Sequence, residues 1–326
     1  MTLFGAMSSF IWQQILLSDI KKAFDVWGDI QMHAYLIMAH KNIEQLKKLL
    51  KLLDAPDNDI FLHIDKKASH LMKDINSQKI CTKSSVVCVP SIDVKWGGVT
   101  QIQAELGLLA CATDRREYAY YHLLSGMDLP LKSQTDIHSF FENNSGKNFV
   151  NFSGMKKNER AQYYWFPEMY DVISHPKFRA LVQKADMLQV GVQKRFRVNR
   201  LKKQKISDLY HGTNWFSITD ELARELVKYK EQFLREFQHS YCCDEVFIQS
   251  YIISNPRWLE TLYKPISYNG FESIARCIDW NRGSPYTWRK EDYSALIQSD
   301  YLFARKFDET VDNEIVERIF KYVNEQ

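Results

Sequence analysis

Residues 33–67 read HAYLIMAHKNIEQLKKLLKLLDAPDNDIFLHIDKK, and this stretch decides the fold. Its first part, His33–Ala39, is an almost continuous apolar run that predicts a buried strand. Leucines recur at helical spacing in Glu44–Leu53 and predict an amphipathic helix, and Ile60–Ile64 predicts a second strand. A strand, a helix and a strand in close succession are typical of a layered α/β domain.

The same alternation continues through most of the chain. Residues 158–205 are the exception, because they are rich in aromatic and then basic residues and show only weak periodicity. We predict one domain over residues 32–326, with further strands at Ser85–Val89, Tyr118–Leu124, Phe149–Phe152 and Gly212–Ile218, and further helices at Gln101–Thr113, Asp220–Phe237, Asp244–Ile253 and Asn313–Tyr322.

The N-terminal residues 1–31 contain an apolar segment at roughly helical spacing, interrupted by Gln13 and Gln14. No positive charge precedes it, so neither a signal peptide nor a membrane span is predicted. We expect a helical extension, packed on the domain or resting on a membrane surface. Met32 is an alternative translation start.

The composition is that of a globular protein, with 326 residues, 45% hydrophobic and 25% charged. A formal net charge of +3 is too small to predict a nucleic-acid partner, although it suits an anionic ligand. The six cysteines lack the spacing of a zinc site, and reduced thiols in a cytoplasmic protein are the simplest interpretation.

Short catalytic motifs are missing: there is no Walker loop, GxGxxG, GxSxG or HExxH. Four cations near the C-terminus offer a dispersed alternative, Arg289 and Lys290 in TWRKED and Arg305 and Lys306 in FARKFD. Two of them could converge on a diphosphate and stabilise the charge of a departing nucleotide, as a metal ion does elsewhere. The competing interpretation is a solvated basic face.

A pair of carboxylates, Asp244 and Glu245, falls at the predicted start of a helix in CCDEVFIQS. The helix dipole favours acids there, and Asp244 can serve as the N-cap. Capping explains one acid but not two. Glu245 in a partly apolar cleft would suit a general base.

Three residues are expected where strands end, at the edge at which open α/β sheets bind ligands. His63 and Asp65 close the strand in LHIDKK, and Asp128 follows the next strand in SGMD. Asp65 could accept hydrogen bonds from a base or a ribose.

Two literal motif matches are discounted. Asp57 and Asp59 fit the Asp-x-Asp signature of metal-dependent glycosyltransferases, but they lie in a PDND turn, where such residues are common. Asn143 and Asn151 begin Asn-x-Ser triplets, which are glycosylation acceptors only in a secreted chain.

Eight segments in order, between about Met32 and Asp308, resemble the core-2/I-branching β-1,6-N-acetylglucosaminyltransferase and peptide O-xylosyltransferase family, glycosyltransferase family 14, especially its short bacterial members. The segments are AYLIMAHKN, FLHIDKK, VKWGG, YHLLSGMDLPLKS, GTNWFSIT, CCDEVFIQS, ARCIDW and SDYLFARKFD.

The resemblance implies a GT-A-like nucleotide-sugar-binding fold, with a mixed, mostly parallel sheet flanked by helices. It also implies inversion without a metal or other cofactor, with Glu245 as catalytic base and Arg289 and Lys306 on the donor diphosphate. The remaining assignments are Asp65, His63, Trp96, Asp128 and Trp280 for the nucleotide and donor, and, more weakly, Trp215 and Asp244 for the acceptor. Trp215 as a core aromatic and Arg305 as the partner of a carboxylate are the competing interpretations.

We therefore expect transfer from a UDP-sugar, UDP-GlcNAc first and UDP-xylose second, to a glycan or lipid-linked glycan in bacterial surface-polysaccharide or lipopolysaccharide synthesis. The family's animal members have membrane anchors and disulfides, neither of which is predicted here. A basic run could face an anionic acceptor or the inner face of the cytoplasmic membrane: Lys194, Arg195, Arg197, Arg200, Lys202, Lys203 and Lys205. The alternatives are an inactive nucleotide-sugar-binding module and a metal-dependent sugar nucleotidyltransferase.

Overall fold

The computed structural model describes residues 31–76, 79–172, 176–204 and 208–326. The predicted N-terminal helical extension lies outside these residues. Within these ranges, no helix combines the length and the apolar character needed to cross a bilayer.

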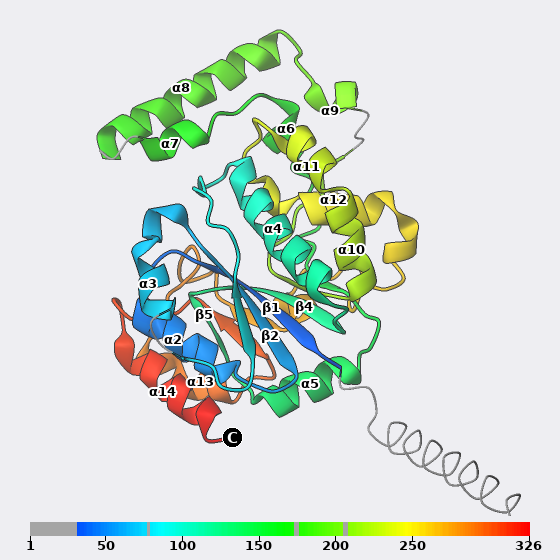
Figure 1. The fold of residues 1–326 in the computed structure, drawn as a ribbon. Coiled ribbons are helices and arrows are strands. Elements are labelled where there is room, and N and C mark those ends of the chain that lie inside the picture. Colours follow the sequence, from blue (N-terminus) through cyan, green and yellow to red (C-terminus); the bar gives the residue numbers. More distant parts are fainter. Residues whose placement is uncertain (1–30, 77–78, 173–175, 205–207) are drawn as a thin grey trace, which may run out of the picture.

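A six-stranded mixed sheet forms the centre of the molecule (Figure 1). The first four strands in its order are parallel, and the last two continue it through antiparallel pairing, β7 on β4 and β6 on β7. The mixed, mostly parallel sheet that was predicted is confirmed. Its order is β3 (Ser85–Cys88), β2 (Asn58–Ile64), β1 (His33–Ala39), β4 (Tyr120–Ser125), β7 (Phe216–Ile218) and β6 (Phe149–Val150).

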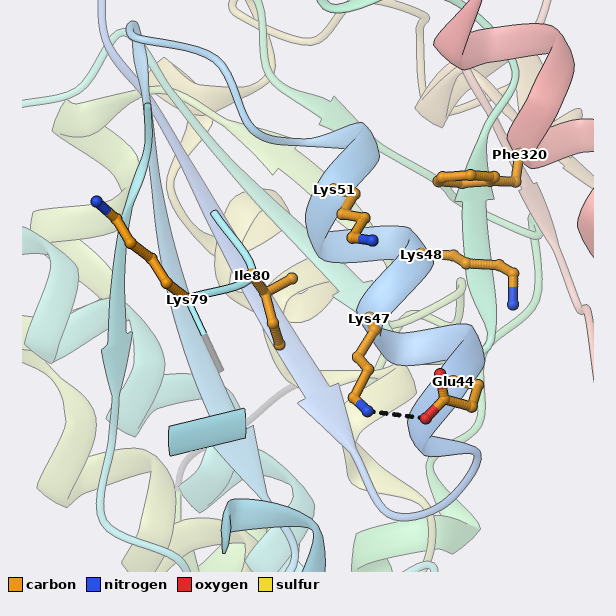
Figure 2. A pocket seen from close by; sticks show the side chains of 7 residues that line it. All are labelled: Glu44, Lys47, Lys48, Lys51, Lys79, Ile80 and Phe320. Carbon is orange, nitrogen blue, oxygen red and sulfur yellow. Dashed lines mark hydrogen bonds and ion pairs between the residues drawn. The ribbon is translucent and has the colours of Figure 1, made fainter. Parts of the chain in front are cut away.

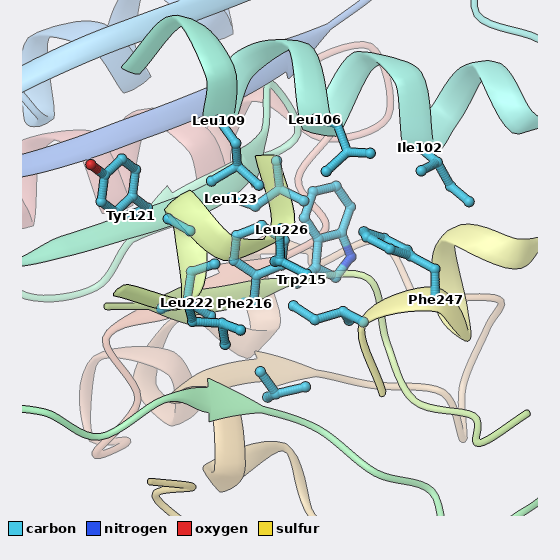
Figure 3. Close-up of a cluster of buried hydrophobic side chains, with 14 of the residues drawn as sticks. Ile102, Leu106, Leu109, Tyr121, Leu123, Trp215, Phe216, Leu222, Leu226 and Phe247 are labelled. Atoms are coloured by element: carbon cyan, nitrogen blue, oxygen red, sulfur yellow. The ribbon is translucent and has the colours of Figure 1, made fainter. Parts of the chain in front are cut away.

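Continuous apolar strands are explained by two cores, one on each face of the sheet. In β1, Leu36 enters one core while Tyr35 and Ile37 enter the other. The first core is covered by α4 (Val99–Arg115), α10 (Asp220–Lys228) and α12 (Phe247–Ser254), and Figure 3 shows part of it. The second is covered by α2 (Ile43–Leu52), α3 (His70–Asn76), α5 (Gln134–Glu142) and α14 (Asn313–Asn324).

A second, three-stranded sheet packs beside the first. Its order is β5 (Asp128–Pro130), β9 (Phe303–Arg305) and β8 (Arg276–Ile278), with α13 (Tyr293–Ile297) between β8 and β9 in sequence. The fully buried Arg276 donates to the carbonyls of Leu123 on β4 and Phe216 on β7, 2.9 and 3.0 Å away. Arg276 therefore ties the small sheet to the place where the large sheet turns from parallel to antiparallel.

Several predicted boundaries were wrong. The predicted helix Asp220–Phe237 breaks at Tyr229 into α10 and α11 (Lys230–Phe237), and both pieces pack on α4. The predicted helix Asp244–Ile253 is a 3₁₀ turn, η2 (Cys243–Glu245), followed by α12. Asp244 is not an N-cap, because its carboxylate accepts a hydrogen bond from the Gln101 side chain instead, at 3.0 Å.

The region without a predicted element, residues 158–205, is mostly helical where the structure describes it. It contains α6 (Glu159–Gln162), α7 (Glu168–Val172), α8 (Pro176–Arg195) and α9 (Arg200–Gln204). This layer lies at the edge of the molecule, beside α4 and α11 (Figure 1). The two ends of this region lie side by side. Ser153 N donates to His211 O and Lys157 N donates to Leu209 O, both at 2.8 Å.

Candidate active site

The predicted edge of the sheet carries Asp65 directly after β2. Its carboxylate caps the next turn by accepting from the Lys67 N–H at 2.8 Å, and the Lys67 ammonium lies 3.9 Å away. The location predicted for Asp65, outside the carboxyl end of a strand, is confirmed. Its contact with a nucleotide stays a prediction.

His63 and Asp128 occupy the same edge and are buried, as Asp65 is. The His63 ring is 2% exposed and its Nε2 accepts from the Ile92 N–H at 3.2 Å. The Asp128 carboxylate, 1% exposed, accepts from Ser125 N at 2.9 Å and from Arg305 Nη1 at 2.7 Å. The alternative in which Arg305 pairs with a carboxylate is thus confirmed. Both side chains hold the loops that shape the edge, and donor binding by either stays a prediction.

The segments that carry Arg289 and Lys306 lie side by side, because Trp288 N donates to Lys306 O at 3.0 Å. Arg289 is exposed and Lys306 is half-buried. Burial lowers the pKa of Lys306, and the charges of Arg305 and Lys41 lower it further. A bound anion would relieve this repulsion, so the cluster is electrostatically suited to a diphosphate.

Glu245 lies in the η2 turn with its side chain 30% exposed. One carboxylate oxygen, Oε2, accepts from Arg160 Nη1 at 2.7 Å and is 3.2 Å from His211 Nε2. Among the described residues, neither bond involves Oε1, which leaves that oxygen for a further donor. Burial raises the pKa of Glu245, but the hydrogen bond from His211 and the charge and hydrogen bond of Arg160 bring it below its ordinary value. Glu245 is therefore ionised at neutral pH.

Two buried acids, Asp244 and Glu105, interact electrostatically with Glu245. Burial, followed by the charge of Glu245, raises the pKa of Asp244 to about 7. Burial and the charge of Asp244 raise the pKa of Glu105 on α4 well above its ordinary value. Asn214 donates to Glu105 Oε1 at 3.1 Å. The raised pKa values of Asp244 and Glu105 and the lowered pKa of Glu245 make Glu245 the acid of this group that ionises most readily.

Gly212 positions the Glu245 turn. Its N–H donates to the Glu245 carbonyl at 3.0 Å. A Cβ added to Gly212 would overlap the carbonyl oxygen of Asn151, so only glycine allows this approach. Asn151 itself is 3% exposed and its side chain donates to Gly270 O, which explains why its Asn-x-Ser triplet is not a surface sequon.

The three predicted aromatic residues differ in exposure. Trp96 is 57% exposed and lies edge-to-face with Tyr241, beside the Glu245 turn. Trp280 is 51% exposed in the loop after β8. Trp215 is 8% exposed and belongs to the first core, and the Arg305 guanidinium lies over its ring at 4.2 Å. Trp215 is therefore a core aromatic residue, which was the competing interpretation.

The discounted Asp-x-Asp match lies at the opposite end of β2. Asp59 accepts from Tyr118 Oη at 2.7 Å and from Arg115 Nε at 3.1 Å. Asp59 belongs to β2 rather than to a turn, and it pairs with Ala34 of β1 and Ser85 of β3. It therefore stands away from the ligand-binding edge.

Two contacts of the candidate base were not predicted. Arg160 is on α6, in the stretch with weak periodicity, and nothing in its local sequence marks it. His211 directly precedes the GTNWF segment, so its neighbours could have drawn attention to it. Both meet Glu245 only through the tertiary fold.

A hollow of about 280 Å³ lies elsewhere, on the outer side of α2 (Figure 2). Four lysines line it, and one of them, Lys47, pairs with Glu44 at 2.8 Å. Predicted site residues do not line this hollow, so it is separate from the edge described above. Its lining is Glu44, Lys47, Lys48, Lys51, Lys79, Ile80 and Phe320.

Comparison with known proteins identifies the family to which this chain belongs. The family model described as Branch, Core-2/I-Branching enzyme, matches residues 33–300. Xylosyltransferase of Ciona intestinalis is 21% identical over 305 residues, covering 87% of this chain and 33% of the relative. Xylosyltransferase sqv-6 of Caenorhabditis elegans is 23% identical over 292 residues, covering 85% and 34%. The chain thus spans about a third of the length of the curated relatives that it matches.

Among solved structures, S. aureus TarS covers 35% of this chain at 13% identity with a TM-score of 0.27, an overlap too small to carry an argument. The family match is what decides the class: residues 33–300 form a glycosyltransferase domain. The chain belongs to the Core-2/I-Branching enzyme family.

Proposed function

We propose that this chain is an inverting glycosyltransferase that moves a sugar from a UDP-sugar to an acceptor hydroxyl without a metal ion. The observation that carries the proposal is the state of Glu245, an ionised carboxylate with one oxygen held by Arg160 and His211 and the other left for a substrate. A general base needs this combination of charge, fixed orientation and access.

In the proposed reaction, the acceptor hydroxyl gives its proton to Glu245 Oε1 as its oxygen attacks the anomeric carbon. The bond between that carbon and the β-phosphate oxygen breaks, and UDP leaves with the electron pair. Attack from the face opposite an α-linked UDP gives a β-glycoside. Fixed hydrogen bonds on Oε2 keep the carboxylate oriented during the transfer, at no cost in reorganisation.

The departing diphosphate would be stabilised by Arg289 and Lys306. Their segments are hydrogen-bonded to each other, and burial together with the charges of Arg305 and Lys41 lowers the pKa of Lys306, an effect that a bound anion would oppose. Two cations on one diphosphate supply the charge stabilisation that a divalent metal supplies in other enzymes.

The donor is UDP-GlcNAc or UDP-xylose. The first was preferred from sequence, and the names of the relatives favour the second. We place the reaction in bacterial surface-polysaccharide or lipopolysaccharide synthesis, in the cytoplasm at the inner face of the membrane, with a glycan or lipid-linked glycan as acceptor. Arg200 of the predicted basic run is buried and donates to the carbonyls of Tyr163 and His239, so it cannot meet an acceptor. The exposed cations Arg195, Arg197 and Lys202 suit an anionic acceptor.

Calorimetric titration with UDP, UDP-GlcNAc and UDP-xylose, followed by turnover in excess EDTA, tests the proposal. We expect binding of UDP and one UDP-sugar, and turnover that survives chelation. Transfer lost in EDTA and restored by manganese would contradict the metal-free mechanism. Binding without turnover would indicate an inactive sugar-nucleotide module, and pyrophosphate release from a nucleoside triphosphate would indicate a nucleotidyltransferase.

A further inference from the structure

Helix α8 presents an apolar stripe to solvent. Leu181, Leu188 and Val192 are 62%, 73% and 56% exposed, and Ala185 between them is also exposed. Positions 181, 185, 188 and 192 follow spacings of four, three and four residues, which place them on one side of a helix. Large side chains are rarely exposed in such a row on a soluble surface without a function.

The opposite side of α8 is already occupied. Asp186 and Val190 are each 5% exposed, and Asp186 accepts from Phe166 N at 3.1 Å. Gln189 and Gln193 donate to the carbonyl of Tyr164 at 2.6 and 3.0 Å. The helix is therefore anchored to residues 164–170 by this side, and the exposed apolar side chains lie on the other side. Helix α8 itself lies at the edge of the molecule (Figure 1).

Cations flank the apolar stripe. Lys184 and Arg195 are exposed on α8, and Arg197 and Lys202 are exposed just beyond it. The single acid of residues 176–205, Asp186, is buried on the other side. A helix with an apolar face, a basic flank and no exposed acid has the composition of helices that lie in the interface of an anionic bilayer. A second copy of this chain would bring the same cations face to face, which disfavours pairing.

We propose that the apolar stripe of α8 lies on an anionic lipid surface, with Leu181, Leu188 and Val192 below the headgroups and the flanking cations among the lipid phosphates. Such a helix contributes both buried apolar area and electrostatic attraction, so neither part alone gives stable attachment.

This contact deepens the proposed function, because α8 is one layer away from the candidate base. Lys194 of α8 pairs with Glu159 at 2.8 Å, and the next residue, Arg160, pairs with Glu245 at 2.7 Å. Attachment through α8 would hold this side of the enzyme against the surface in which a lipid-linked acceptor resides.

Flotation of the full chain with vesicles tests the contact without any sugar transfer. We expect binding to vesicles of equal parts phosphatidylcholine and phosphatidylglycerol, no binding to phosphatidylcholine alone, and weaker binding as salt is raised. The triple variant Leu181→Ser, Leu188→Ser, Val192→Ser should lose binding by on the order of tenfold or more. The matched control Ile266→Ser, Val311→Ser changes residues that are 41% and 42% exposed on other segments, and it should bind like the wild type.

Failure of the wild type to float with anionic vesicles, or equal binding by the triple variant, would overturn the lipid contact. So would a concentration-dependent dimer in sedimentation velocity that the triple variant dissolves, since a second copy would then cover the stripe. Calorimetry with UDP on the same samples separates the two proposals. Intact UDP binding without flotation rejects only the lipid contact, and flotation without UDP binding rejects only the proposed transferase site.

Discussion

At the scale of single residues, Glu245 is the side chain on which the proposed chemistry depends. Replacing it with Gln keeps the shape of the side chain but removes the charge that accepts a proton. We expect Glu245→Gln to bind UDP normally and to lose turnover by roughly two to four orders of magnitude. Calorimetry and steady-state rates measure the two effects separately, and near-normal turnover would exclude Glu245 as the base.

His211 adjusts the basicity of Glu245 rather than touching the substrate in this arrangement. Its hydrogen bond favours the ionised carboxylate, so His211→Ala should raise the pKa of Glu245. The acid limb of the kcat/KM profile would then move to higher pH. His211→Gln, which can keep a donor near Oε2, should restore part of the shift. An unchanged profile in the alanine variant would show that His211 has no electrostatic influence on the base.

Asp244 predicts a pH dependence of stability. Its pKa rises from an ordinary value of 3.8 to about 7 in the folded protein, so the folded state holds this proton more tightly than the unfolded state. The resulting stabilisation is complete below about pH 4 and is lost as pH rises toward 7. Asp244→Asn should remove a decline of about 1–3 kcal/mol over that range. Urea unfolding of both proteins at several pH values measures the difference, and parallel curves would contradict the shift.

The candidate residues that sequence could identify are those whose position follows from a strand end or from a family segment, such as Asp65 and Glu245. Arg160 and His211 could not be identified in this way. They are 85 and 34 residues from Glu245 in sequence, and only the packing of α6 and of the chain before β7 brings them to it.

At the scale of elements, β1 was predicted at its observed bounds and α2 within one residue, because apolar periodicity reports burial directly. The failures have local causes. Residues 212–215 leave the predicted strand because their backbone and side chains bond Glu245, Asn151 and Glu105. Helix α9, which precedes them in sequence, was not predicted. It belongs to a layer held largely by polar contacts, so its sequence lacks a regular apolar pattern.

The prediction at the scale of elements concerns Gly212. Gly212→Ala must displace the Asn151 carbonyl or the Glu245 turn, and we expect a loss of about 2 kcal/mol or more in the free energy of unfolding, together with reduced turnover. Gly107→Ala is the matched control, because a Cβ added in the middle of α4 meets no atom within 4 Å beyond its chain neighbours and the backbone of its own helix. The control should gain up to about 1 kcal/mol. Equal effects of the two variants would contradict the role of Gly212.

At the scale of the whole molecule, a buried histidine cluster at the amino ends of the strands makes folding sensitive to acid. His122 Nε2 lies 3.0 Å from His33 Nδ1, and the His33 and His138 rings stack at 3.8 Å. Burial, followed by the neighbouring imidazoles, holds the pKa values of His33 and His122 well below the ordinary 6.5. The cluster lies beneath the sheet end opposite the candidate site, so it affects stability rather than catalysis.

A depressed histidine pKa means that the unfolded chain binds more protons below about pH 6.5, so the free energy of unfolding falls as the pH decreases through that value. We expect a loss of about 1–3 kcal/mol between pH 7 and pH 5 in an Asp244→Asn background, which removes the opposing trend of Asp244. Chemical unfolding at the two pH values provides the measurement. A stability that does not change would show that the imidazoles are protonated within the fold.

The excursion of the chain between β6 and β7 has an evolutionary consequence. Residues 151–215 depart from one strand and rejoin its immediate antiparallel neighbour, and hydrogen bonds join the two ends of the excursion. Lengthening or replacing a segment that closes on itself in this way costs little entropy and shifts no strand. Both ends of the segment also carry residues that hold the candidate base, because Arg160 and His211 contact Glu245. We therefore expect sequence variation to be tolerated in the middle of the segment, between these two residues, and restricted at its ends.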